Sequence, residues 1–408
     1  MGRNASPPPA VRRLADALLA CLALSTPLSI SGMQIAMGTL GILALLGIPL
    51  RWGVVRRTPL DGVLALLFGV FAVSTVASGH PFRAVGWLRP PWLLSSYFVV
   101  SWWLRDRDHA RRMALFVVAA GAVAGGYGVL QHFTGVDWYR EAIGSATRVR
   151  PRVPGAEGFA VVGFYRNYLT YAHAMIFPLA WAGAFALRGS VLGAVAAVLL
   201  TLAIVFSTAR GVWIGVAAGG VLLAVLGRGR RGLGLVVAGV AVAASAVAIS
   251  RGLREQAAPL FTLEGVNAGR AAIYRANLEI IHDHPLLGLG FGRYKTAATP
   301  YYDRHPDADR RSHAHSNVLQ IAAEAGLVGL AAFCLLFAVI LRRGFDAVRA
   351  ATDGGQWATA VGAWVGIATF FLAGLTQYSF GDAEVVISLW VAVAVLMQCV
   401  DDVRMEPV

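Results

Sequence analysis

The chain has 408 residues, of which 57% are hydrophobic and only 14% are charged, and its mean hydropathy is +0.63. Average soluble proteins carry about a quarter charged residues, so this composition excludes an ordinary soluble fold. The formal net charge of +13 would also suit a nucleic-acid-binding protein, but the basic residues stand at the ends of apolar runs, where they orient membrane helices. We therefore expect membrane lipids, and no nucleic acid, among the partners.

Apolar runs, most of them about 17–25 residues long, follow one another along the chain, and this is the length that crosses a bilayer core. Because the runs are continuous and not alternating, they predict helices and exclude a β-barrel. The sequence predicts an all-α polytopic membrane protein of about 12 transmembrane helices, in a single integral membrane domain over residues 1–408. The predicted spans are Leu14–Ser31, Gln34–Leu50, Leu60–Ser78, Trp92–Leu104, Met113–Phe133, Tyr168–Leu187, Val191–Ser207, Gly211–Gly227, Leu233–Ile249, Asn317–Leu341, Trp357–Leu375 and Val385–Val400.

Arginine clusters, beginning with Arg12 and Arg13, fall in every second short connection between these runs. By the positive-inside rule those connections face the cytoplasm, which predicts a bacterial inner-membrane protein with both termini in the cytoplasm. The two longest connections, residues 134–167 and 250–316, are then periplasmic loops. Both contain more arginine than orientation requires, which suggests an anionic ligand; attraction to anionic lipid headgroups is the alternative.

The second periplasmic loop contains a predicted amphipathic helix that runs from Asn267, its expected N-cap, to His284. Pro285 ends this helix, and a glycine-rich stretch that is expected to form a flexible turn follows it. The helix is predicted to bury one face through residues at helical spacing, which are Ala271, Tyr274, Leu278 and Ile281.

The sharpest local signal is the segment His313-Ala-His315-Ser316-Asn317, directly before the apolar run that ends at Leu341. Ser316 or Asn317 is expected to cap that helix, which places His315 at its outward N-terminus. The helix dipole there disfavours a positive charge, so a neutral imidazole could act as a general base beside a site that attracts phosphate. The alternatives are interfacial histidines bonded to loop carbonyls, or a zinc site; no suitable third ligand is nearby, so no metal is expected.

Arginine supplies the second signal. Arg210 lies in a very short outward connection, close to the hydrocarbon edge, where a charge either has a function or reaches toward the headgroups. Arg270 and Arg275 lie at the start of the amphipathic loop helix and could line the same cavity. Because guanidinium groups pair with phosphate oxygens in a bidentate way, these residues around one histidine suit a diphosphate leaving group.

On these residues the sequence resembles the O-antigen ligase and polymerase superfamily of bacterial envelope glycosyltransferases. The ligases' motif is a His followed by Asn, Ser or Gln, then nine residues, Gly, two residues, and Gly, Thr or Tyr. This sequence matches it with His315-Ser316, the nine residues 317–325, Gly326 and Gly329, and further similarity lies in Arg210, in Gly269-Arg270 and in Ile280 with His284-Pro285.

The resemblance implies a C-type glycosyltransferase-like fold, a donor glycan linked to undecaprenyl diphosphate and lipid A–core as acceptor, with no cofactor. It further implies a metal-independent, inverting single displacement in which His315 is the base. Arg210, Arg270 and Arg275 would then hold the diphosphate, and His313 and Asn317 are further candidates for substrate binding.

Other functions stay open at this stage. A polymerase of the same superfamily would join repeat units on the same carrier, and a protein-glycosylating ligase is less expected because such proteins usually carry additional C-terminal sequence. A secondary transporter would also suit about twelve helices, but the predicted spans are nearly free of the buried charges that couple transport. A structural scaffold would tolerate the replacement of Arg210 and His315.

Overall fold

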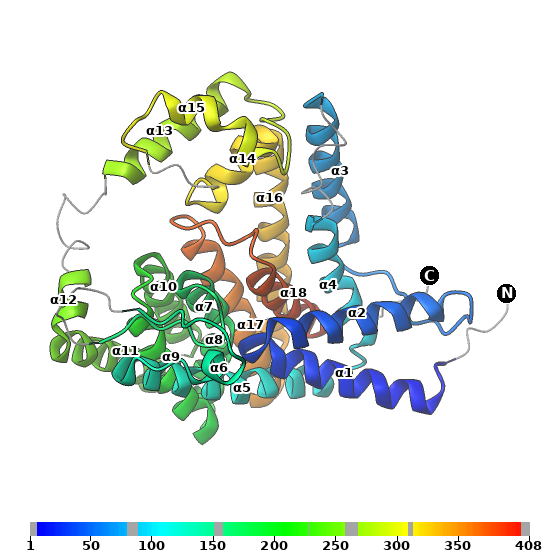
Figure 1. Cartoon of the computed structure of the whole chain (residues 1–408). Coiled ribbons are helices and arrows are strands. Elements are labelled where there is room, and N and C mark those ends of the chain that lie inside the picture. The colour runs from blue at the N-terminus through cyan, green and yellow to red at the C-terminus, as the bar shows by residue number, and fades with distance from the viewer. Residues whose placement is uncertain are drawn as a thin grey trace.

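The computed structural model describes residues 6–79, 89–150, 158–227, 229–257, 268–308 and 313–400, and these residues fold mostly into helices (Figure 1). The N-terminal helices are α1 (Pro9–Leu28), α2 (Ile30–Gly47), α3 (Asp61–Ala77), α4 (Arg89–Trp103), α5 (Arg107–Thr134) and α6 (Trp138–Ala142). The central helices are α7 (Tyr168–Ala174), α8 (Ile176–Leu187), α9 (Val191–Ser207), α10 (Arg210–Gly227), α11 (Arg230–Ile249) and α12 (Arg251–Ala257). The last group comprises α13 (Ala268–Asp283), α14 (Tyr294–Ala297), α15 (Thr299–Asp303), α16 (Asn317–Ala350), α17 (Gly354–Ala373) and α18 (Ala383–Gln398).

The structure supports a polytopic helical membrane protein but not the predicted number of spans. Within the described residues, seven helices are long and apolar enough to cross a membrane, and four further apolar helices are shorter. The physical reason is length: a helix of 17 residues such as α3 or α9 rises about 26 Å, less than the bilayer core of about 30 Å. Helix α1 is long enough, but its N-terminal half carries Arg12, Arg13 and Asp16.

Helix α18 lies at the centre of the helical body. Every residue from Val385 to Met397 is buried, because α18 packs on α4, α17, α5 and α7. The peripheral helices show the opposite pattern: Val237 and Val240 of α11 are 58% and 62% exposed. Apolar side chains that face outward in this number are expected of helices that contact lipid.

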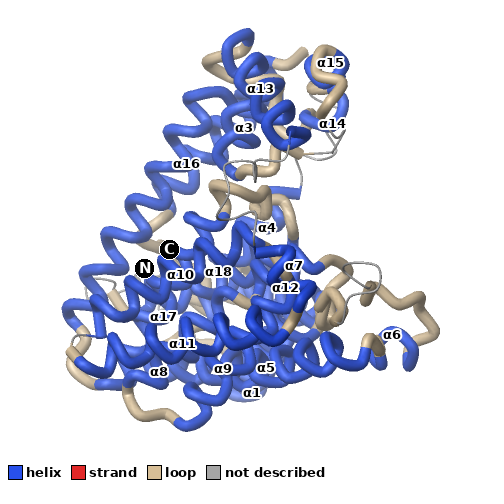
Figure 2. The backbone as a smooth tube through the Cα atoms, turned by 90° about the vertical axis from the view of Figure 1, so that its left-hand side faces the viewer, coloured by secondary structure: helices blue, strands red, loops and turns tan. Residues whose placement is uncertain are grey.

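Beyond this body stands a small helical unit that we call the cap, formed by α13, α14 and α15 (Figures 1 and 2). The cap has its own apolar core, which includes Ile273, Ile280 and Tyr302 and continues into Ala323 of α16. It rests on the first turns of α16, and α16 lies side by side with α3 in both views. The cap is therefore connected to the helical body mainly through α3 and α16.

A break in α16 fixes the position of the cap. Gly326 has φ 68° and ψ −171°, so the helix stops at Ala325 and resumes at Leu327. Residues 285–290 run alongside the break, where the Leu327 amide donates to the Pro285 carbonyl (2.7 Å) and the Leu289 amide donates to the Ala323 carbonyl (2.9 Å). The predicted glycine-rich turn is present, but it is bonded to α16 and not a loose connection.

The predicted cap helix exists as α13, whereas its expected N-cap, Asn267, lies outside the described residues. The predicted buried face was wrong, because Leu278 is 58% exposed and the face through Ile273, Ala276 and Ile280 is buried instead. The buried face also includes Asn277, whose amide oxygen accepts a hydrogen bond from the Tyr294 hydroxyl (2.9 Å). A polar residue in this core hid the true face from a pattern based on apolar side chains.

Candidate functional site

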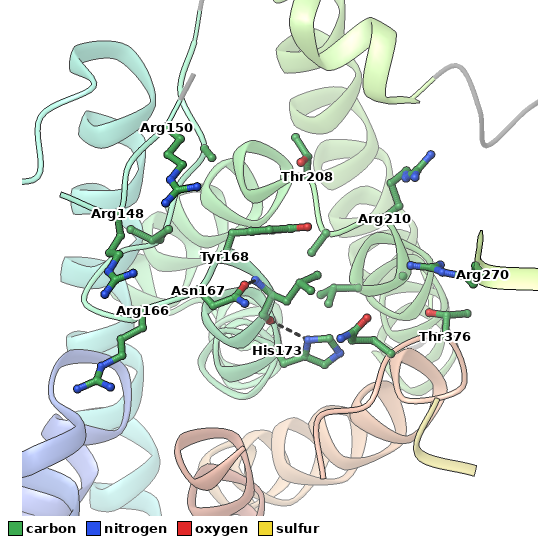
Figure 3. A pocket seen from close by; sticks show the side chains of 17 residues that line it. Arg148, Arg150, Arg166, Asn167, Tyr168, His173, Thr208, Arg210, Arg270 and Thr376 are labelled. Carbon is green, nitrogen blue, oxygen red and sulfur yellow. Dashed lines mark hydrogen bonds between the residues drawn. The ribbon is translucent and has the colours of Figure 1, made fainter. Parts of the chain in front are cut away.

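A cavity of about 440 Å³ opens where the first long loop, the α9–α10 turn, the cap and the α17–α18 loop meet. We call it the arginine cavity, because five of its lining residues are arginines: Arg148, Arg150, Arg166, Arg210 and Arg270. Figure 3 shows the first three on one side of the cavity and Arg210 and Arg270 on the other, with Tyr168 and Thr208 between them. None of the five forms an ion pair with a carboxylate in the described part of the chain.

In the described part of the first long loop, residues 134–150 and 158–167, one buried ion pair joins Asp137 and Arg140. Asp137 is fully buried, and its Oδ2 accepts hydrogen bonds from the Arg140 guanidinium (2.8 Å) and from the Arg148 backbone amide (3.2 Å). Its Oδ1 accepts hydrogen bonds from the Tyr127 hydroxyl (3.0 Å) and the Gln131 side chain (3.3 Å). A buried ion pair with this many partners holds the loop backbone in place and sets the position of Arg148 at the cavity.

The α9–α10 turn places Arg210 at the first position of α10. Thr208 ends α9 in the left-handed conformation (φ 53°), so only two residues separate the two helices, as the sequence predicts. Helix α10 then packs closely on α17 and the loop after it through glycines: a Cβ at Gly219 would lie 2.2 Å from the hydroxyl oxygen of Thr369 in α17, and a Cβ at Gly211 would lie 2.2 Å from that of Thr376 in the α17–α18 loop. This close approach brings Arg210 to the same cavity wall as Gln377.

The cap contributes one of its two predicted arginines to the cavity. Arg270, at the start of α13, lines it, whereas Arg275 does not and is exposed. Five residues along an α-helix correspond to a rotation of about 140° between the two side chains, so they project from different faces. The expectation that Arg275 lines the same cavity was therefore wrong.

His315 lies directly behind the cavity wall. Its ring is 6% exposed, and its Nδ1 lies 3.2 Å from Oε1 of Gln377, which itself lines the cavity. With the amide oxygen in this position, Nδ1 carries the ring proton and Nε2 carries the lone pair. His313 lies beside it, with ring centroids 4.4 Å apart, and its Nδ1 accepts the His315 backbone amide (3.3 Å).

The segment that carries His315 is held from both sides. Ser316 is the N-cap of α16, as predicted, and its hydroxyl accepts the Leu319 amide (3.3 Å). Gln320 accepts the amide of Ala314, the residue between the two histidines (2.8 Å). His315 itself has φ 54°, a conformation that non-glycine residues seldom adopt and that these flanking bonds hold in place.

Asn317 has a different position from the one that the sequence suggested. It is 2% exposed, does not line the cavity, and its Oδ1 accepts the amides of Ser379 (2.8 Å) and Phe380 (3.0 Å). The backbone amide of Asn317 donates to the Gly374 carbonyl (2.7 Å). Asn317 therefore anchors the α17–α18 loop that carries Gln377, and the predicted direct contact with substrate has no support in this geometry.

Sequence reasoning missed a histidine that lines the cavity itself. His173 of α7 lines it, is 1% exposed, and its Nδ1 lies 2.8 Å from the Leu169 carbonyl oxygen (Figure 3). Its Nε2 is buried and has no hydrogen-bond partner among the described residues. His173 stands between two alanines within a predicted span, and no motif or cluster of polar residues there indicated a role in a site.

Arg148, Arg150 and Arg166 were noticed as surplus arginines of the first loop, but nothing in the sequence connected them with Arg210. The signal was their number in an outward loop; their meeting with the cap is a property of the tertiary fold. In the part of the chain that the structure describes, no three His, Cys, Asp or Glu side chains come together in a way that could hold a metal ion.

The fold and the cavity together define a polytopic helical membrane protein with an arginine-lined cavity. Residues 195–334 match the family model of the O-antigen ligase, which confirms the resemblance seen in the sequence and supports membership of the O-antigen ligase superfamily. The matched segment contains Arg210, Arg270 and His315 but not the first-loop arginines, His173 or Gln377. No curated protein matches the chain.

Proposed function

We propose that this protein is an O-antigen ligase, which transfers a glycan from undecaprenyl diphosphate to a sugar hydroxyl of lipid A–core. The family match supports a glycosyltransferase activity of the ligase or polymerase type. The observation that carries the proposal further is the arginine cavity, where five guanidinium groups have no carboxylate partner among the residues that the structure describes. Guanidinium groups gathered around one cavity repel one another, so this cluster suits a ligand that carries several negative charges.

The diphosphate would occupy the side of the cavity that holds Arg210 and Arg270. Guanidinium groups stay charged and pair with phosphate oxygens through two parallel N–H bonds. Negative charge on the diphosphate increases as the bond from the anomeric carbon to the leaving oxygen breaks. Arginines placed there stabilise the transition state more than the ground state, which is the condition for catalysis.

His315 is proposed as the general base. Its Nε2 would take the proton of the acceptor hydroxyl while that oxygen forms a bond to the anomeric carbon and the diphosphate leaves with the bonding electron pair. Gln377 would hold the ring in the tautomer that has its lone pair on Nε2. The displacement is single and inverting, and the proposal requires no metal. His313, which packs against His315, is proposed to contact the substrate.

The orientation in the membrane is part of the proposal. The arginine clusters of the short connections would lie in the cytoplasm with both termini, and the cap and cavity would face the periplasm. The carrier lipid would then reach the cavity from the outer leaflet of the inner membrane. We expect the C-type glycosyltransferase-like architecture on the same grounds of resemblance.

The test is transfer by the purified protein from an undecaprenyl-diphosphate-linked glycan to lipid A–core, measured in the presence of a chelator. We expect wild type to modify lipid A–core, and Arg210→Ala and His315→Ala to lose nearly all transfer while they keep the wild-type melting temperature. Wild-type rates in both variants would refute the mechanism. Elongation of the lipid-linked glycan without any modification of lipid A–core would identify a polymerase instead.

A further inference from the structure

His173 is a polar residue of the arginine cavity that the proposed mechanism does not use. Its side chain lies in α7, within the helical body, and is 1% exposed. His173 lines the cavity, and Figure 3 shows its ring below Tyr168 and on the same side as Thr376; the dashed line marks the bond of Nδ1 to the Leu169 carbonyl oxygen. It is thus close to the α17–α18 loop, whose Gln377 bonds to His315.

The hydrogen bond to Leu169 determines which ring nitrogen can accept. A carbonyl oxygen cannot donate, so Nδ1 must carry the proton in its 2.8 Å contact with that oxygen. A second proton on Nε2 would add a buried positive charge beside a cavity that already contains five arginines. Nε2 is therefore an acceptor, and it has no partner in the structure.

A buried acceptor without a partner costs free energy, so such an atom next to a cavity points to a ligand that donates a hydrogen bond. Phosphate diesters offer only acceptor oxygens and cannot satisfy it. A sugar offers hydroxyl donors along its whole ring. A ligand that joins an anionic part to a carbohydrate part would therefore suit both the arginines and Nε2 of His173.

We propose that His173 is a substrate-binding residue whose Nε2 accepts a hydrogen bond from a hydroxyl of the sugar bound in the arginine cavity. The inference rests on the proposed function, because it assumes that a sugar joined to a diphosphate enters this cavity. It places the carbohydrate on the α7 side, next to the loop that links Gln377 with His315. Nε2 is itself buried, so the hydroxyl reaches it once the side chains above it move aside.

Two substitutions separate the two nitrogens. His173→Asn keeps an N–H group at the position of Nδ1, able to donate to the Leu169 carbonyl, but removes the acceptor. His173→Gln extends further and places an amide oxygen near the position of Nε2. If His173 has only a structural role, His173→Asn should be the less damaging substitution, because it keeps the bond to Leu169. If Nε2 accepts a hydrogen bond from a sugar, His173→Gln should be the less damaging one.

The measurement is binding to the full-length protein in nanodiscs, with two probes: undecaprenyl diphosphate alone and undecaprenyl diphosphate that carries the glycan. For His173→Asn we expect the glycan-bearing probe to bind about tenfold more weakly, because one hydrogen bond is lost. Binding of the sugar-free probe should not change. His173→Gln should restore most of the loss. Equal affinities of wild type and His173→Asn for both probes, or equal losses for both probes, would overturn the assignment.

Steady-state kinetics provide a second readout of the same contact. In His173→Asn we expect kcat/KM to fall about tenfold when the donor is varied, and a fall seen only when lipid A–core is varied would overturn the assignment to the donor sugar. A wild-type protein that binds the glycan-bearing probe but transfers nothing would refute the proposed function and leave the binding comparison valid.

Discussion

Gly326 offers the most direct test of how the cap is fixed to the helical body. Its backbone conformation, φ 68° and ψ −171°, is one that essentially only glycine adopts. A Cβ there would lie 2.1 Å from the Leu286 carbonyl oxygen, far inside contact distance, and the atoms it meets are backbone. Gly326→Ala must therefore either displace residues 285–287 or distort the break in α16.

Each of the two costs is about 1–3 kcal/mol, one for the backbone conformation and one for the overlap, so the expected destabilisation is about 4 kcal/mol. In a chain of this size that lowers the melting temperature by about 5 °C. Transfer activity should fall as well, because residues 285–290 connect Arg270 of the cap with the α16 segment that begins behind His315.

The assay is thermal unfolding of the purified protein in detergent, followed by transfer at a temperature where both proteins are folded. Gly239→Ala is the matched control, since a Cβ at this α11 glycine meets no atom within 4 Å and alanine favours a helix. We expect the control to melt at or slightly above the wild-type temperature. A Gly326→Ala protein that melts and transfers like wild type would show that the break does not hold the cap.

Three further results are expected. Arg270→Ala should lower kcat/KM at least tenfold, whereas Arg275→Ala, outside the cavity, should stay within twofold of wild type; equal effects would contradict the placement of Arg270. Asp137→Ala leaves Arg140 buried without its partner and should cost about 3–5 kcal/mol in thermal unfolding, while an unchanged melting temperature would show that the pair is dispensable. Burial raises the pKa of Tyr294 above its ordinary value near 10, so its contribution to stability is complete below about pH 10 and is lost as pH rises further; the melting temperature should fall less between pH 9 and 11 in Tyr294→Phe than in wild type.

The sequence predicted the helical segments well, because a run of apolar residues is a local property. Seventeen residues of α9 agree with the predicted span from Val191 to Ser207. The number of membrane-crossing helices was less predictable, since several helices are too short by length alone. Ser316, one of the two predicted caps, is the N-cap of α16, and α10 begins at Arg210, one residue before the predicted span that starts at Gly211; both features depend on only a few neighbouring residues.

The candidate site was predictable only where its residues share a segment or a known motif. Arg210 and Arg270 were expected to meet, and they line one cavity. Gln377 contacts His315 across 62 positions of sequence, and no pattern in either segment announces that contact. The place of His173 in the cavity could not be predicted for a related reason, because the surrounding fold decides whether a lone histidine in a helix has a hydrogen-bond partner.

Helix α18 has a consequence for the order in which this membrane protein can assemble. Its buried surface is formed against α4, α5, α7 and α17, all of which precede it in the chain. During synthesis those helices enter the membrane before the helix that fills the space between them exists. Until α18 inserts, the surfaces of these helices that later contact it face lipid or pack loosely against one another. The native packing of the bundle is therefore complete only after α18 has inserted. The arginine cavity, which depends on the loop just before α18, is then among the last parts of the protein to form.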